Sequence, residues 1–491
     1  MGANPMTTDG ISPAPTRERL LVAAICLAAA FRVFMFCAAF PFFNNVDETS
    51  HFDLVYKYSR GHLPAAPLEK LDPQVVDIVV PNATGEYYGR PQDRSAQWLT
   101  ESAAFLRNQD NRETWAWPTY YLLAGLWCWL GRLLGLTGGH LLYWIRFLNV
   151  PIVAAFVWLS YIFSRKLLPD GRQRIAVPLI IAFFPQDIFF SITSDVLSPL
   201  MFAAAFFMLL EICFGEKSWR YHLLTGLAVA ATFLTKVSNI TILPLAAAVF
   251  LIKIKQAVSQ KQLKHYIPSL AAFAVTVTIP VALWLGRNYI LFGDLVGAAK
   301  SMQLRTWTKK PFSEMFNHPI FTPSGLFFFL ADLTKTFWRG EFIWRSKRMA
   351  CPLMDWFYCV SSAVFLLASL LGVIINKPKM DKHYRFALGA ALFVVTLSVV
   401  LLAVLSMRYD FGQCFYPSRA QPYFTSGRLI AGAILPFLLL YIDGLQRILA
   451  KTYLASRLLI TVGVIVAAVT VCEIILTLPV FASTYNLFHL K

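Results

Sequence analysis

The sequence predicts an all-α polytopic membrane protein, and three observations support this fold class. Of its 491 residues, 57% are hydrophobic and 14% are charged, whereas soluble proteins carry about 25% charged residues. Nearly uncharged windows of about 18 residues or more recur along the chain, each long enough to cross a hydrocarbon core of about 30 Å as a helix. The formal net charge of +17 comes mostly from short segments between these windows, as the positive-inside rule expects. We therefore interpret the positive charge as a sign of membrane topology, and we expect no nucleic-acid partner.

The first predicted span runs from Leu20 to Phe43 and is interrupted by Arg32. Residues 1–19 are expected to form a cytoplasmic tail without a cleavable signal, because Arg17 and Arg19 hold the N-terminus inside. A first outer loop of about residues 44–115 follows and is too long for a simple connector. Its start, Asp47–Arg60, has apolar residues at helical spacing, which predicts an amphipathic helix on the membrane surface.

Further spans are predicted along the rest of the chain, at residues 117–136, 141–163, 175–190, 196–214, 222–234, 240–252, 267–285, 356–375, 386–407, 429–442 and 458–480. The basic segments between them are expected on the cytoplasmic side, at residues 165–174, 217–220, 253–264, 377–385 and 447–457.

The count of spans leaves one ambiguity. An odd number of crossings must separate the outer loop from Arg165, yet only two apolar stretches lie between them. Either one stretch is re-entrant or surface-lying, or the region holds three short, broken helices. We expect a single transmembrane domain over residues 20–491 with about 11 to 13 spans and its C-terminus outside.

A second large outer loop is expected at about residues 289–352. It contains a moderately apolar stretch, Pro319–Leu330, and the aromatic, basic segment TFWRGEFIW at residues 336–344. This pattern predicts a helix packed on the membrane surface, or a loop that roofs a cavity. Cys351 and Cys414 fall in two segments expected outside, so a disulfide between them is one option. The eight cysteines show no metal-binding spacing.

Isolated charges at the outer rim of the spans are the candidate functional residues, because charges beside a bilayer are costly. They come from five regions of the chain and comprise Asp47, Glu48 and His51, Asp195, Lys236, Arg287 with Asn288, and Arg428. Acids and bases that converge at one water-facing level suit a phosphorylated, lipid-borne substrate. The cations would hold the phosphate, and the carboxylates would bind a metal or act as a base.

Each candidate also has a simpler interpretation. Asp195 could cap the helix that begins at Val196, and Lys236 could be a snorkelling lysine. The remaining alternatives are interface arginines at Arg287 and Arg428, a surface histidine at His51, and a solvated helix start at Asp47 and Glu48.

Several segments together resemble the GT-C superfamily of polytopic glycosyltransferases. After the first span the chain reads VDETSHFDLVYKYSRGHLP, which is similar to a group of bacterial membrane proteins of unassigned function with a DExxHF-type opening. The aminoarabinose and protein O-mannosyl transferases are more distant. The other segments that carry the resemblance follow in order over nearly the whole chain: WPTYYLL, SITSDVLSPL, FLTKVSNI, GRNYILFGD, TFWRGEFIW and TSGRLIAGAILP.

The resemblance implies a GT-C-like helical bundle with surface helices in the first outer loop. It also implies an inverting transferase in a bacterial inner membrane, which passes a sugar from a polyprenyl-phosphate donor to an envelope glycan, lipid or protein acceptor. Asp47 would be the general base, and Glu48 would assist it or bind a divalent metal such as Mg²⁺ or Mn²⁺ together with Asp47. The substrate-binding set would be Asp195, matching a second acidic position, the cations Lys236, Arg287 and Arg428 around the donor phosphate, and Asn288 and His51.

The chain departs from the family pattern at two places. First, the paired prolines that relatives have before the second span are replaced by Trp117-Pro118-Thr119. Second, Leu429 follows the late Gly-Arg pair where relatives have an aromatic residue, and this difference weakens the case for Arg428 as a site residue. A lipid-linked-sugar flippase or transporter is the chief alternative, and a non-catalytic scaffold is a third. A transporter would place charges near mid-bilayer, often in two related halves. Charges at one rim and the lack of a visible sequence repeat favour the enzyme.

Overall fold

The computed structural model is mostly helical and describes residues 15–43, 47–66, 68–83, 85–86, 95–168, 170–297, 299–375, 380–414, 416–450 and 457–489. Within these residues, nine helical segments are long and apolar enough to cross a membrane: Thr16–Ala39, Gly138–Leu167, Ser194–Phe214, Val237–Ser259, Leu263–Phe292, Pro352–Ile375, Lys382–Arg408, Gly427–Ala450 and Leu458–Phe481. The predicted fold class is confirmed, and the chain is an integral, multi-pass membrane protein. The nine candidate spans of the described residues are fewer than the roughly 11 to 13 expected from the sequence. Most of the predicted cytoplasmic tail lies outside the described residues, and the first helix begins at Thr16.

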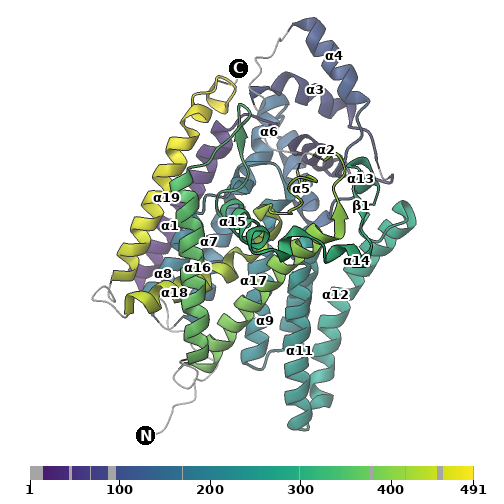
Figure 1. The fold of residues 1–491 in the computed structure, drawn as a ribbon. Helices are drawn as coiled ribbons and strands as arrows, with labels where there is room; N and C mark the ends of the chain where they lie inside the picture. Colours follow the sequence, from purple (N-terminus) through teal and green to yellow (C-terminus); the bar gives the residue numbers. More distant parts are fainter. Residues whose placement is uncertain are drawn as a thin grey trace.

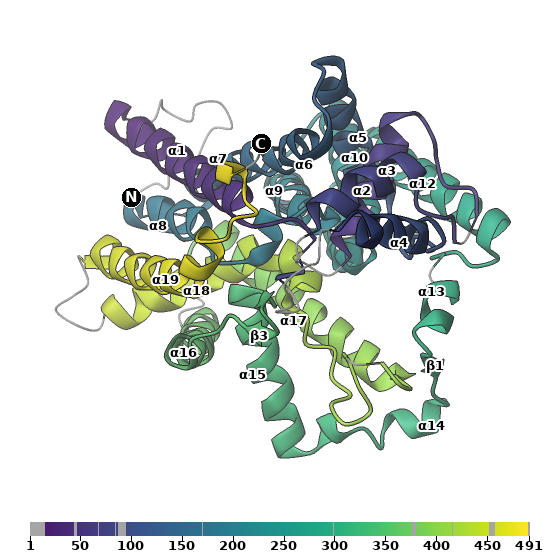
Figure 2. The same ribbon diagram turned by 90° about the horizontal axis from the view of Figure 1, so that it is seen from above.

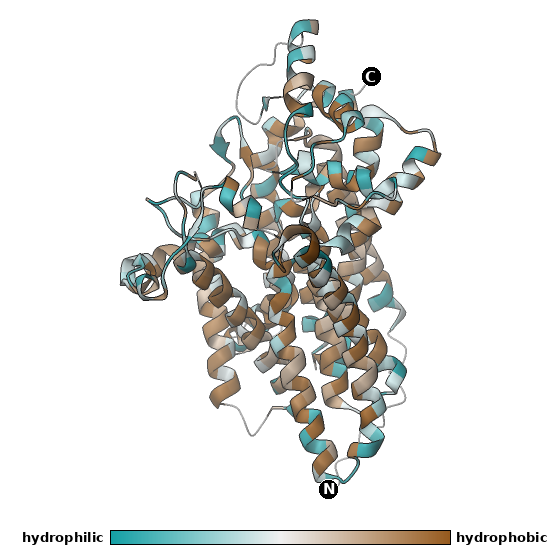
Figure 3. Ribbon diagram, turned by 90° about the vertical axis from the view of Figure 1, so that its right-hand side faces the viewer, coloured by the Kyte–Doolittle hydropathy of each residue, from teal (hydrophilic) through white to brown (hydrophobic). Residues whose placement is uncertain are grey.

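The spanning segments contain helices whose bounds are α1 (Thr16–Ala39), α7 (Asn149–Leu167), α9 (Ser198–Phe214), α11 (Ile242–Ser259), α12 (Leu263–Phe292), α16 (Pro352–Ile375), α17 (Lys382–Arg408), α18 (Ile434–Ala450) and α19 (Leu458–Phe481). Three of these helices are preceded by a 3-10 turn, namely η3 (Ser194–Leu197) before α9, η4 (Val237–Thr241) before α11 and η6 (Gly427–Ala433) before α18. Figure 3 shows the apolar residues concentrated along the bundle, with hydrophilic residues towards its two ends.

Two shorter apolar helices pack within the same bundle. The first, α8 (Gly171–Ala182), contacts α7, α18 and α19, and the second, α10 (Trp219–Thr235), contacts α9 and α12. The predicted span at residues 175–190 ends early because Pro185 disfavours helical backbone at the residue before it. The chain continues there as the 3-10 turn η2 (Asp187–Phe190). The sequence predicted a span here, but α8 is only 12 residues long and is too short to cross the hydrocarbon core.

The ambiguous region before Arg165 folds as a hairpin followed by one crossing. Helices α5 (Pro118–Leu133) and α6 (Gly138–Phe147) pack against each other through the stacked rings of Trp127 and Trp144, whose centroids are 4.4 Å apart. Each indole N–H donates to the other residue's carbonyl oxygen at 2.7 Å. The chain then runs down the bundle as α7 (Figure 1). A single helix therefore carries the chain to Arg165, which gives the odd number of crossings that the basic segment requires.

The C-terminal ends of α7, α9, α11, α16 and α18, next to the basic segments, lie at one end of the bundle, the end at which α1 begins (Figure 1). The helices that follow, α8, α10, α12, α17 and α19, start from the same end. The positive-inside rule assigns this end to the cytoplasm. Because α19 runs in the same direction as α1, its last residue, Phe481, lies at the opposite end. We refer to that opposite end as the outer end.

The outer end is built from the two long loops. The first loop contains α2 (Glu48–Ser59), α3 (Pro73–Asn82) and α4 (Ala96–Arg107). The helix expected over Asp47–Arg60 is present as α2, but it is largely buried and packs on α5, so it does not lie on the membrane surface. Gly125 of α5 permits this packing, because a Cβ there would fall 2.8 Å from the Tyr58 Cβ.

The second loop holds α13 (Ala299–Leu304), β1 (Thr308–Lys309), α14 (Phe312–Met315), η5 (Pro319–Phe321), α15 (Pro323–Arg339), β2 (Ile343–Trp344) and β3 (Lys347–Arg348). The strands are minimal: β2 pairs antiparallel with β3, and β1 pairs with β4 (Tyr409–Asp410). Seen from above, α15 lies across the bundle (Figure 2). It exposes Leu326, Phe327 and Leu330 while Phe329 and Leu333 are buried. The predicted helix is therefore present, and its position at the membrane surface stays a prediction. A last short turn, η8, covers Leu487–His489.

Candidate functional site

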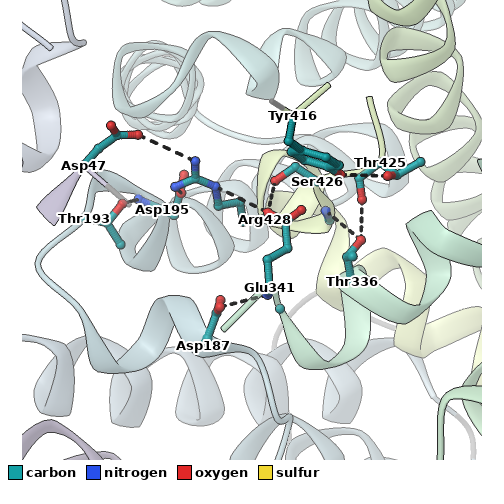
Figure 4. A network of polar contacts seen from close by, with 12 residues as sticks. Asp47, Asp187, Thr193, Asp195, Thr336, Glu341, Tyr416, Thr425, Ser426 and Arg428 are labelled. Atoms are coloured by element: carbon teal, nitrogen blue, oxygen red, sulfur yellow. Dashed lines mark hydrogen bonds and ion pairs between the residues drawn. The ribbon is translucent and has the colours of Figure 1, made fainter. Parts of the chain in front are cut away.

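The site is centred on Arg428, which lies in η6 at the outer end of the bundle. Its guanidinium faces three carboxylates from separate parts of the chain: Nη2 lies 3.9 Å from Asp47 Oδ2, Nη1 lies 3.7 Å from Asp195 Oδ2, and Nε lies 3.9 Å from Glu341 Oε2. Figure 4 shows the Arg428 side chain reaching between these groups. We call Arg428, Asp47, Asp195, Glu341 and Lys236 the Arg428 cluster.

Asp47 enters the cluster from the residue that precedes α2. Its backbone has φ 70° and ψ 0°, a left-handed conformation that aspartate tolerates better than most residues. Its carbonyl oxygen accepts the His51 N–H at 3.0 Å, while its carboxylate is left to point at Arg428 (Figure 4). Since the Asp47 and Arg428 side chains are each 24% exposed, both can be reached by a molecule in solution.

Asp195 and Lys236 form the buried side of the cluster. Asp195 lies in η3, and its Oδ1 accepts a hydrogen bond from the Lys236 ammonium group. Thr193, not Asp195, provides the side-chain cap here, since its Oγ1 accepts the Asp195 N–H at 3.3 Å. The Asp195 carboxylate is therefore not the helix cap considered as the simpler interpretation, because it is paired with Lys236. Burial and the positive charge of Arg428 hold the pKa of the Lys236 ammonium well below its usual range.

Broken helix starts bring these side chains together. The turn η6 packs against both η3 and η4, and Lys236 immediately precedes η4. Gly427 lets η6 approach the end of α15, because a Cβ at this position would fall 2.1 Å from the Phe337 nitrogen. The close approach places Arg428 beside Glu341, which follows α15 after Gly340.

Glu341 and Asp187 are site residues that the sequence did not single out individually. The Glu341 N–H donates to Asp187 Oδ2 at 2.9 Å, and the Ser426 hydroxyl donates to Glu341 Oε2 at 2.6 Å. Gly340 makes room for this contact, since a Cβ there would lie 2.2 Å from the Asp187 carboxyl. Burial raises the pKa of the Asp187 carboxyl to about 6. The sequence feature that could have identified Asp187 is its position as the single acid inside the apolar run FFPQDIFF.

Glu113 is a third acid that sequence reasoning missed. It lies in the first outer loop, five residues before α5, and its Oε1 is 3.5 Å from Arg305 Nη2. Burial and the charge of Asp47 raise the pKa of the Glu113 carboxyl to about 7, against the opposite effects of Arg305, Arg428 and Lys236. The effect of the Asp47 charge on Glu113 indicates that Glu113 lies in the electrostatic field of the Arg428 cluster.

The structure assigns Glu48 to a different partner from Asp47. Its carboxylate is paired with Arg146 of α6, with both Nε–Oε1 and Nη2–Oε2 distances at 2.9 Å, and it accepts the N–H groups of Phe43 and Ile192 at 2.8 and 3.0 Å. With four donors on its two oxygens, this carboxylate is not free to bind a metal or to take a proton. We therefore keep Asp47 and omit Glu48 from the Arg428 cluster.

The side chains of His51, Arg287 and Asn288 make no hydrogen bond or ion pair with the Arg428 cluster in the described ranges, and His51 meets it only through its backbone N–H, which donates to the Asp47 carbonyl oxygen. His51 Nδ1 lies 2.6 Å from the Tyr121 hydroxyl, and burial lowers the pKa of its imidazole to about 4. Arg287 stacks over the Trp284 ring at 4.5 Å and donates to the Pro64 carbonyl oxygen. Asn288 accepts from Arg287 at 3.0 Å. Their predicted role in substrate binding stays a prediction.

The predicted metal pair, Asp47 with Glu48, does not fit a divalent cation, because Glu48 is fully engaged and Asp47 faces a guanidinium. Across the described ranges no group of three or more His, Cys, Asp and Glu side chains is placed to bind a metal ion. The Arg428 guanidinium occupies the centre between Asp47, Asp195 and Glu341, where a metal ion would have to bind.

Comparison with known proteins identifies the family. The family of predicted membrane proteins DUF2142 matches residues 30–413. The chain belongs to the DUF2142 family. Its match includes every member of the Arg428 cluster except Arg428 itself, which lies beyond residue 413. No curated protein matches the chain.

Two solved structures are similar to this DUF2142 protein at low identity. One is an oligosaccharyltransferase from Archaeoglobus fulgidus in complex with Zn and sulfate, with 12% identity, a TM-score of 0.45, and coverage of 94% of this chain and 53% of that chain. The other is the oligosaccharyltransferase AglB of the same organism with an inhibitory peptide and a dolichol-phosphate, with 11% identity, a TM-score of 0.46, and coverage of 96% and 56%. The DUF2142 protein thus spans about half the length of these enzymes.

Proposed function

We propose that the protein transfers a sugar from a polyprenyl-phosphate donor to an acceptor hydroxyl at the outer face of the membrane, with inversion. The observation that carries this proposal is the loose seating of Arg428. Three carboxylates surround it at 3.7–3.9 Å, yet its buried Nε has no hydrogen-bond partner among the described residues. A guanidinium held this loosely can still donate hydrogen bonds to an incoming oxyanion.

A phosphate group supplies such an oxyanion. Arginine binds phosphate through parallel N–H···O bonds, and Lys236 adds a second positive charge beside Asp195. When the bond between the sugar's anomeric carbon and the phosphate oxygen breaks, the phosphate leaves with its negative charge. Two cations held at its position stabilise that charge in the transition state, and the leaving group then needs no protonation.

Asp47 is the proposed general base. It faces the same guanidinium as the proposed phosphate site and is 24% exposed, so an acceptor hydroxyl can approach it from the water. It would take the hydroxyl proton as the oxygen attacks the anomeric carbon on the side opposite the phosphate. One base suffices for such a displacement, and the inverted configuration follows from the direction of attack.

A lipid-borne donor suits the surroundings of the cluster. Glu341 follows α15 after Gly340, and α15 exposes apolar side chains at Leu326, Phe327 and Leu330. A helix of this kind lies at the boundary between headgroups and acyl chains. The polyprenyl tail would stay in the bilayer beside α15 while its phosphate reaches Arg428. The GT-C resemblance of the motifs supports the same substrate class and a bacterial inner membrane.

The test compares two aspartate variants in the purified full-length protein. Radiolabelled polyprenyl-phosphate sugars are supplied in detergent with candidate glycan, lipid and protein acceptors, and release of sugar from the lipid is counted together with transfer. Asp47→Asn should lower the rate by about a hundredfold or more, as expected for loss of a general base. Asp77→Asn is the matched control, because Asp77 is 58% exposed on α3, and it should leave the rate unchanged.

Equal rates for wild type and Asp47→Asn would contradict the proposed role of Asp47. A flippase would give a different pattern: no sugar release with any donor, combined with movement of the labelled lipid between leaflets of vesicles. That result would replace the transferase proposal with the transport alternative.

A further inference from the structure

A second feature of the outer end lies behind the Arg428 cluster. A cavity there is bounded by the end of α1, η2, α19 and the segment between α15 and α16. Its lining includes Asp187, Arg339, Cys351, Cys472 and Glu473. Asp187 therefore belongs to both the cavity wall and the hydrogen bond that positions Glu341.

Two cysteines line this cavity. Cys351 directly precedes α16, and Cys472 lies in α19, so 120 residues separate them in the sequence. Both residues are partly exposed, and both are free thiols in this structure. The partner expected from the sequence, Cys414, instead directs its thiol to the Tyr416 carbonyl oxygen at 3.5 Å.

We propose that Cys351 and Cys472 form a reversible disulfide that clamps the start of α16 to α19. Cys351 lies at the outer end, directly before α16, and Cys472 lines the same cavity from within the spanning helix α19. A cavity that opens to the outer side of a bacterial inner membrane, the membrane proposed for this protein, meets an oxidising compartment. The oxidant is a disulfide, supplied by a thiol–disulfide oxidoreductase or a small molecule. One thiolate attacks the oxidant's disulfide and releases its first sulfur as a thiol. The second cysteine then attacks the mixed disulfide and releases the other.

The balance of this exchange is two protein thiols oxidised and one external disulfide reduced to two thiols. Its structural consequence falls on residues 341–351. This segment is held at one end by Glu341, which contacts Asp187 and Ser426, and at the other end it reaches Cys351. Oxidation would fix the second end to α19 and so restrain the β2–β3 turn between them.

Thiol counting in the full-length protein tests the pairing. The detergent-purified protein is equilibrated in reduced or oxidised glutathione, denatured, and labelled with a maleimide that adds a fixed mass. All eight cysteines should be labelled after reduction, and two fewer after oxidation. Cys351→Ser and Cys472→Ser should each give seven labels in both states, whereas Cys414→Ser should still lose two on oxidation. Mass spectrometry of the wild type should recover a peptide linked through Cys351 and Cys472.

A second readout does not depend on the variants folding well. Arg345, Lys347 and Arg348 are exposed in the β2–β3 turn, so trypsin should cut there more slowly in the oxidised wild-type protein. Eight labels in both redox states would overturn the proposal, and so would a linked peptide containing Cys414. Because no step uses donor or acceptor, the outcome is independent of the proposed sugar transfer.

Discussion

Arg146 holds the Glu48 carboxylate from one edge, with its Nε and Nη2 each 2.9 Å from a separate oxygen. Both side chains are almost fully buried, with exposures of 2% and 1%. The same guanidinium donates to the carbonyl oxygens of Phe40 and Pro41, where α1 ends. Two neighbouring acids thus have different roles: Glu48 fixes the connection between α1 and α2, and Asp47 is left to face Arg428.

The first prediction separates these two acids. Glu48→Gln should fold poorly or unfold at a markedly lower temperature, because removal of one partner from a buried ion pair costs about 3–5 kcal/mol. Asp47→Asn should retain a melting temperature close to wild type, because its nearest cation is 3.9 Å away and both side chains are partly exposed. Thermal unfolding in detergent, followed by circular dichroism, measures both. A Glu48→Gln protein as stable as wild type would contradict the anchoring role.

A second prediction concerns phosphate binding by Arg428. If its Nε and Nη groups hold a lipid phosphate, Arg428→Gln should weaken binding of a short-chain polyprenyl phosphate by about tenfold to a hundredfold, the equivalent of about 1.5–3 kcal/mol for a hydrogen bond to a charged group. The control is Arg419→Gln, because Arg419 is 68% exposed and pairs with Asp410 outside the cluster. Binding is measured as ligand-dependent thermal stabilisation. Equal weakening by the two variants would show a non-specific charge effect.

How far the sequence reached is clearest in the Arg428 cluster. Asp47, Asp195, Lys236 and Arg428 could be selected because each is an isolated charge at the outer rim of an apolar span. Leu429, where relatives have an aromatic residue, weakened the assignment of Arg428 to the site. The position of Arg428 instead depends on the close approach of the Gly427 backbone to α15, and no side-chain pattern in the sequence reveals this approach. Glu48 was included because it adjoins Asp47, and its partner Arg146 is 98 residues away in sequence.

The spans show the same limit. Hydropathy located the apolar segments well, since burial in lipid requires only composition. It could not decide between a crossing and a hairpin at α5 and α6, because that choice depends on the stacking of Trp127 on Trp144. It also missed that Arg32, the charge interrupting the first span, meets Glu473 of α19 within the bundle, with Nε 3.0 Å from Oε2. Such pairs join distant parts of the chain and leave no local signature.

A third prediction uses the pKa of Glu113. In the folded protein this pKa is raised from an ordinary value of 4.5 to about 7, so between these two pH values the native state keeps a proton that the unfolded chain has lost. Stability from this group must therefore fall as pH rises from about 4.5 to 7 and change little above that, by on the order of 3 kcal/mol at most. His51, with a folded pKa of about 4, acts in the opposite direction at low pH.

The comparison of wild type with Glu113→Gln isolates the contribution of Glu113, since His51 is common to both proteins. Melting temperatures measured at intervals between pH 5 and 8 should show wild type losing ground to the variant up to about pH 7 and then running parallel to it. Parallel curves over the whole range would mean that Glu113 is ionised throughout, and they would contradict the raised pKa of its carboxyl.

The last prediction tests whether the close approach at Gly427 positions Arg428. In Gly427→Ala the new Cβ would fall 2.1–2.4 Å from backbone atoms of Thr336 and Phe337. Because these atoms belong to the α15 backbone, the strain cannot be relieved by a rotamer change, and η6 must move away from α15. Stability should fall by about 1–3 kcal/mol. Binding of polyprenyl phosphate should weaken as well, because Arg428 moves with η6. Gly389→Ala in α17, where nothing lies within 4 Å of the new Cβ, should change neither quantity. Loss of stability without loss of binding in Gly427→Ala would separate the packing of η6 from the placement of Arg428.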